Sequence, residues 1–139
     1  MLHAKSHELK QVFLLHLSVC RSCTGVLKNS HRLLLFYAIE CGLKVLLLKK
    51  IKGNITEDFV NHKKLGELSG KYGHNIKYML KYLGYGQFFL PDLPCKNGQK
   101  APPTEYNQVW RYGIESDNTV QDKIEKELLE IAAWLERRV

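Results

Sequence analysis

Two ionisable side chains lie in the middle of a strongly apolar stretch. Glu40 and Lys44 are four residues apart, so on a helix they share one face and can form an ion pair. A buried charge needs a partner, and we therefore expect Glu40 and Lys44 to be a structural polar pair that fixes the orientation of its helix. The alternative is that they line a ligand site.

A second group of polar residues is basic. His74, Lys77 and Lys81 are spaced at i, i+3 and i+7, which places them on one helical face. Such a face can bind the phosphates of nucleic acid or a nucleotide, although a merely solvated face has the same pattern. We expect His74 itself to cap its helix or to bond to a carboxylate such as Glu40. A catalytic role for His74 as a general base is the alternative.

Basic and aromatic residues alternate around this face. Lys71, Lys77 and Lys81 are interleaved with Tyr72, Tyr78, Tyr82, Tyr85 and Phe88. Aromatic side chains beside ammonium groups can stack on bases while the lysines contact phosphate. The same mixture is typical of a core edge covered by amphipathic side chains, and we favour that interpretation.

No motif in the chain indicates a metal or a cofactor. Cys20 and Cys23 form a CxxC, but it lies in an apolar helical pattern and no second pair of ligands completes a zinc site. We therefore interpret both as core residues. Glycine-rich phosphate loops, HExxH and Gly-x-Ser-x-Gly are absent. Four cysteines with no disulfide framework are typical of a cytoplasmic protein.

Length and charge limit the class of protein. The 139 residues suit a single domain, 1–139, and the net charge is +7. Residues 1–114 carry 17 Lys/Arg against 7 Asp/Glu, whereas residues 115–139 carry 4 against 7. The excess of positive charge indicates a phosphate-bearing partner or serves solubility alone. The acidic end could be a face for a partner protein.

The elements that must position these residues are helical. Apolar spacing predicts helices over 8–28, 31–51, 56–72, 74–83 and 119–138, with Ser30, Thr56 and Thr119 as N-terminal caps. Residues 31–51 are apolar nearly all round, which predicts a central helix covered by its neighbours. Glu40 and Lys44 interrupt that stretch, so we expect no membrane span. Prolines break the pattern in 85–104, which predicts a long loop with a turn at Asn97-Gly98, either functional or holding an unrecognised short element.

Three segments resemble the HEPN family. Residues 37–44 (YAIECGLK) are similar to its second helix, and 73–80 (GHNIKYML) to the segment that opens its next helix. Residues 110–112 (WRY) resemble an Arg-Tyr pair found before its final helix. The resemblance implies an all-α antiparallel bundle of four to five helices that pairs as a homodimer. It also implies that Arg111 belongs to the basic surface with His74.

The resemblance carries two functional expectations. RNA-cutting HEPN proteins have an Arg, four to six residues and then a His, and no His follows Arg21, Arg32 or Arg111 at that spacing. We therefore expect a non-catalytic module that binds RNA, a nucleotide or a partner such as a nucleotidyltransferase in a prokaryotic toxin–antitoxin or antiviral defence system. A divergent, metal-independent ribonuclease that uses His74 and Arg111 is the alternative.

Overall fold

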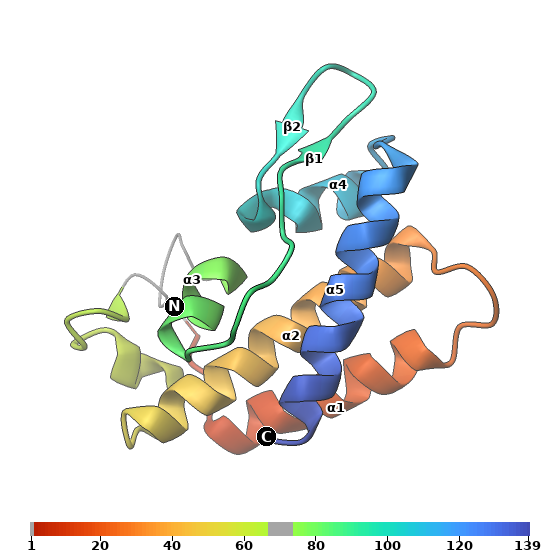
Figure 1. Cartoon of the computed structure of the whole chain (residues 1–139). Helices are drawn as coiled ribbons and strands as arrows, with labels where there is room; N and C mark the ends of the chain where they lie inside the picture. Colours follow the sequence, from red (N-terminus) through yellow and green to blue (C-terminus); the bar gives the residue numbers. More distant parts are fainter. Residues whose placement is uncertain (1, 67–73) are drawn as a thin grey trace.

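The computed structural model describes residues 2–66 and 74–139, and this part of the chain is mostly helical (Figure 1). The elements in chain order are α1 (Ser6–Arg21), α2 (Asn29–Lys50), the 3-10 helix η1 (Thr56–Phe59), α3 (Ile76–Tyr82), β1 (Leu93–Pro94), β2 (Lys100–Ala101), the 3-10 helix η3 (Pro103–Glu105), α4 (Tyr106–Tyr112) and α5 (Asn118–Glu136). Of the five α-helices described, α1, α2 and α5 are long, and α3 and α4 have seven residues each.

Helix α2 is the centre of the structure, as its sequence predicts. It packs against α1, α3, α4 and α5, and most of its side chains are buried (Figure 1). Its partners are amphipathic helices, each of which turns one apolar stripe toward it or its neighbours. Among the described residues, no helix has the length and apolar content needed to cross a membrane.

The three long helices meet at Gly42. A Cβ atom at this position would lie 3.1 Å from the side chains of both Phe13 on α1 and Leu135 on α5. That separation is tighter than an ordinary van der Waals contact, so the missing side chain is what allows α1 and α5 to approach α2 so closely.

The three predicted N-terminal caps are wrong. Thr56 is already the first residue of η1, and Ile55 holds the cap position. Helix α2 begins at Asn29, one residue before Ser30, and no side chain caps it. Helix α5 begins at Asn118, where the side chain of Asp117 accepts a hydrogen bond from the Val120 N–H at 2.9 Å. Asp117 replaces Thr119 as the cap because the helix starts earlier than the apolar stripe does, and a carboxylate serves this position well.

The expected helices over 8–28 and 56–72 are also too long. Helix α1 ends at Arg21, and the described residues 56–66 contain no α-helix but begin with the 3-10 turn η1. The Asp58 carboxylate accepts hydrogen bonds from the N–H groups of Asn54 and Ile55, which close the turn locally and lower the pKa of Asp58. Beyond it, Val60 and Asn61 have low helix propensity. Residues 67–72 lie outside the described part of the chain.

The expected loop over 85–104 holds a short element, a β-hairpin, which is one of the two possibilities that the sequence left open. Leu93 pairs with Ala101 and Pro94 with Lys100, in antiparallel orientation. The predicted turn at Asn97-Gly98 is confirmed, because Gly98 has a φ of 87° and its N–H donates to the Cys95 carbonyl at 3.0 Å. The segment around Ser116 lies along the hairpin, because Ser116 forms an isolated antiparallel bridge with Cys95.

Helix α4 lies between the hairpin and α5 in the chain, and the sequence pattern did not predict it. Helix α4 is too short to show a clear apolar period, and it ends at Gly113 in the left-handed conformation. Its Trp110 is buried, and the indole N–H donates to the side chain of Gln121 at 2.9 Å. This bond joins α4 to the start of α5.

Candidate functional site

Helix α2 places three polar or aromatic side chains on one face. Tyr37, Glu40 and Lys44 follow one another at i, i+3 and i+7, so they point to the same side of the helix. Lys44 Nζ lies 3.8 Å from Glu40 Oε1, which is the ion pair expected from their spacing. The Glu40 side chain is only 9% exposed, so its carboxylate depends on its protein partners.

His74 lies directly before α3 and contacts this face. Its Nδ1 atom is in hydrogen-bond contact with Glu40 Oε1, one of the two arrangements expected for His74. The other arrangement is wrong, because the cap of α3 is Asn75, whose side chain accepts from the Tyr78 N–H at 3.0 Å. The His74 side chain is 45% exposed, so its ring is tethered at one nitrogen and open to solvent elsewhere.

Arg111 reaches the same face from the end of α4. Its guanidinium donates a hydrogen bond to the Tyr37 hydroxyl and lies 5.9 Å from the centre of the Tyr37 ring. The Tyr37 ring centre is in turn 6.1 Å from that of His74. A continuous row therefore runs from Arg111 through Tyr37 and His74 to Glu40 and Lys44, and we call it the polar row.

The polar row contains one residue that the charge pattern could not single out. Tyr37 belongs to the segment 37–44, but only the structure shows that it connects Arg111 to His74. The available signal was its spacing of three residues before Glu40. The resemblance implied that Arg111 lies on one surface with His74, but the apolar spacing gave no sign of its contact with Tyr37, because α4 was itself not predicted.

Lys77 and Lys81 extend the positive charge along α3. Both side chains are exposed, and within the described ranges 2–66 and 74–139 neither ammonium group has an acidic partner. Lys71, the remaining predicted binding residue, lies outside those ranges. Together with Arg111, the two lysines give the site an excess of positive charge over the single carboxylate of Glu40.

The nearby aromatic side chains pack into the edge of the core. Tyr78, Tyr82, Tyr85 and Phe88 are partly buried against it, in agreement with the interpretation that we favoured, and Tyr72 lies outside the described residues. The Tyr78 hydroxyl donates to the Lys64 carbonyl, and the Tyr85 ring meets that of Trp134 edge-on at 4.9 Å. These aromatic side chains therefore already have contacts within the protein. Tyr37, by contrast, lies in the polar row itself, between Arg111 and His74.

The cysteines do not assemble a metal site in the described part of the chain. Cys20 is buried in the core, as expected, and Cys23 is half-buried. Within that part no cluster of three or more His, Cys, Asp or Glu side chains comes together. Comparisons with family models, curated proteins and solved structures find no match to this chain.

Proposed function

We propose that this chain is a HEPN-like module that binds RNA, or another phosphate-bearing ligand, at the polar row and the adjoining face of α3. The observation that carries the proposal is the convergence of Arg111, Tyr37 and His74, three groups distant in the sequence. A guanidinium held against an aromatic ring beside an open imidazole offers phosphate contact and a stacking surface together. Lys77 and Lys81 add two positive charges that have no acidic partner among the described residues.

Salt dependence tests the binding. Three phosphate contacts, from Arg111, Lys77 and Lys81, predict that affinity for a single-stranded RNA of about 20 nucleotides falls roughly 10- to 20-fold between about 50 and 200 mM salt. Fluorescence anisotropy of a labelled RNA measures it. We expect Arg111→Ala and Lys77→Ala each to weaken binding and to flatten the salt slope.

A matched variant separates site contacts from net charge. Lys10 is exposed on α1, and Lys10→Ala removes the same charge as Lys77→Ala. The proposal requires Lys10→Ala to bind RNA nearly as the unchanged protein does. Equal losses in the two variants, or an affinity that salt leaves unaltered, would show that the site does not contact phosphate.

One observation favours ribonuclease activity as a second candidate function. The contact between His74 Nδ1 and the buried Glu40 carboxylate is the arrangement that orients an imidazole for proton transfer, with Nε2 left to accept a proton. If His74 removed the proton of an RNA 2′-hydroxyl, that oxygen would bond to the adjacent phosphorus and form a 2′,3′-cyclic phosphate. The bond from phosphorus to the 5′-oxygen of the next nucleotide would break, and that oxygen would take a proton from solvent and leave as a hydroxyl. Arg111 would stabilise the charge that develops on the phosphate.

Cleavage is tested separately from binding. Labelled RNA is incubated with the protein in the presence of a chelator, and products are resolved on a denaturing gel. If the protein itself cleaves RNA, cleavage should disappear in His74→Ala and fall in Glu40→Gln, and a 2′-deoxy substrate should remain intact. An inert unchanged protein that still binds RNA leaves the binding module as the function. The homodimer implied by the resemblance stays a prediction.

A further inference from the structure

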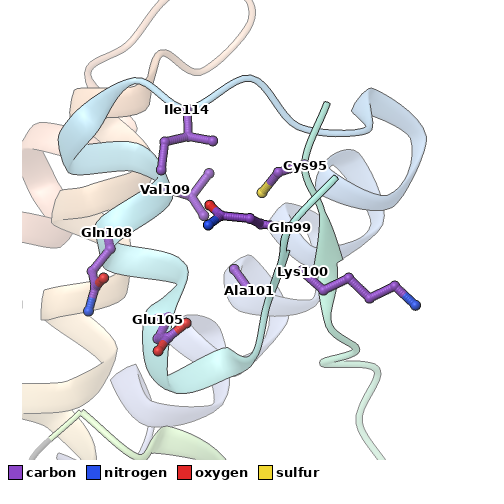
Figure 2. A pocket seen from close by; sticks show the side chains of 8 residues that line it. All are labelled: Cys95, Gln99, Lys100, Ala101, Glu105, Gln108, Val109 and Ile114. Atoms are coloured by element: carbon purple, nitrogen blue, oxygen red, sulfur yellow. The ribbon is translucent and has the colours of Figure 1, made fainter. Parts of the chain in front are cut away.

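A cavity of about 400 Å³ lies between the β-hairpin and α4 (Figure 2). The side chains of Val109, Ile114 and Gln99 point into it, whereas that of Lys100 points away (Figure 2). Lys100 is nevertheless among the residues that line the cavity. The carboxylate of Glu105 lies at the end of the cavity where α4 begins.

The backbone of Lys100 faces away from the hairpin. Cys95 N donates to the Gln99 carbonyl at 2.8 Å, so this pair is hydrogen-bonded and the next pair, Pro94 with Lys100, is not. In a non-hydrogen-bonded pair the N–H and C=O groups point outward on both strands. Pro94 confirms the geometry, because its carbonyl accepts from the Asp117 N–H at 2.8 Å on the outer side.

The two edges of the hairpin differ in their partners. Along β1 the outward groups are taken by residues 115–117, since Lys96 N also donates to the Glu115 carbonyl at 2.9 Å. Along β2, no backbone group in the described residues pairs with the N–H or the C=O of Lys100. Edge groups of this kind form a template for one more strand.

We propose that the open edge of β2 and the adjoining cavity bind an extended peptide segment of another protein, which adds as a strand beside Lys100 and places a Lys or Arg side chain in the cavity. The peptide backbone pairs with the N–H and C=O of Lys100. The aliphatic stem of the incoming side chain packs on Val109 and Ile114, and its charged end meets Glu105.

Charge complementarity selects this occupant. The Glu105 side chain is exposed, and no cation in the described chain pairs with it, although the protein is basic overall. The cavity has aliphatic side chains (Val109 and Ile114), glutamines (Gln99 and Gln108) and one carboxylate at its end, and this combination fits a long aliphatic side chain that ends in a positive charge. An acidic side chain in the cavity would be repelled by the Glu105 carboxylate, and an apolar one would leave that carboxylate without a partner.

A pair of substitutions at one position isolates the backbone contact. Lys100→Pro removes the edge N–H without breaking a hairpin hydrogen bond, because that N–H faces outward. Lys100→Thr removes the same ammonium group and keeps the N–H. The probe is a displayed library of linear peptides of about seven residues with a fixed central Lys, compared with a library with a central Glu.

We expect the central-Lys library to enrich on the unchanged protein. Selected peptides should bind Lys100→Thr as tightly, and bind Lys100→Pro and Glu105→Gln about tenfold more weakly. Circular dichroism verifies that each variant is folded. The proposal is overturned if no peptide enriches, if the central-Glu library enriches equally, or if the folded Lys100→Pro variant binds as well as Lys100→Thr.

Discussion

The reactivity of the Cys41 thiol can be used to test the burial of the polar row, because Cys41 directly follows Glu40 on α2. Burial raises the pKa of the Cys41 thiol to about 11, and the negative charge of Glu40 adds to the effect. Only the thiolate is nucleophilic, and at about pH 8 a thiol with this pKa is roughly 0.1% ionised. The thiol is therefore unreactive under ordinary conditions.

We predict that alkylation of Cys41 by iodoacetamide, followed by mass spectrometry, accelerates about tenfold per pH unit up to about pH 10 without a plateau. The same cysteine in urea should reach its plateau well below that pH, since unfolding removes the burial. A plateau in the folded protein at about pH 8.5 would show that the Cys41 thiol is not buried beside Glu40.

The ion pair between Arg32 and Glu125 is nearly buried, with side chains 10% and 14% exposed and 3.5 Å between Nε and Oε1. Burial raises the pKa of Glu125, and the charge of Arg32 opposes that rise. Because the folded pKa lies above the unfolded one, the cost of ionising Glu125 appears as pH rises through the folded value. Without Arg32 this cost becomes larger.

We predict that Arg32→Leu lowers the free energy of unfolding by about 2–4 kcal/mol at neutral pH and by less near about pH 4, where Glu125 is protonated. The double variant Arg32→Leu/Glu125→Leu should recover most of the loss, because it leaves no unpaired charge in the core. Urea denaturation at the two pH values measures both. A loss that is equal at both pH values would contradict the assigned pairing.

At the scale of elements, the start of α5 depends on Asp117. The carboxylate accepts from the Val120 N–H, and its negative charge also lies at the positive end of the helix dipole. We predict that Asp117→Ala lowers the free energy of unfolding by about 1 kcal/mol. Thr119→Ala, at the position that the sequence favoured as the cap, should change it by less than about 0.5 kcal/mol. Thermal or urea unfolding compares the two, and the opposite ranking would return the cap to Thr119.

The long helices could be predicted from the sequence because each carries its own signal. Helices α2 and α5 have many apolar residues at regular spacing, and the pair Glu40 and Lys44 follows directly from a four-residue separation. Helix α4 has only seven residues and the strands have two each, so neither offers enough repeats for a period to appear. These short elements are fixed by tertiary contacts, such as the bond from Trp110 to Gln121.

The candidate site, too, could be predicted only in part from the sequence. The contact of His74 with Glu40 was one of two arrangements expected, and the sequence alone could not choose between them. The approach of Arg111 to Tyr37 depends on where α4 lies, and no local pattern encodes it. The cavity beside β2 likewise could not be predicted from the sequence, because it is formed by the hairpin and α4 together.

At the scale of the whole molecule, Gly42 sets how closely the three long helices pack. An added methyl group would press on Phe13 and Leu135, which are both fully buried and have little room to move. Alanine improves helix propensity by about 1 kcal/mol over glycine, but overpacking costs about 1–3 kcal/mol. We predict that Gly42→Ala is destabilising overall.

Gly86 provides the matched control. A Cβ atom there meets nothing within 4 Å, and its φ is not positive, so Gly86→Ala should be neutral or slightly stabilising. Denaturant midpoints of the two variants make the comparison. If Gly42→Ala proved as stable as Gly86→Ala, the close approach of α1 and α5 to α2 would not be a tight constraint.

Asp117 takes part in two elements at once. Its N–H donates to Pro94 of the hairpin, and its carboxylate holds the first turn of α5. Fraying of that turn therefore releases the hairpin as well, and the two regions open as one cooperative unit rather than separately. The amide hydrogens of Lys96 and Asp117 should accordingly exchange slowly with solvent deuterium and share a single opening free energy, although the two residues are 21 positions apart in the sequence.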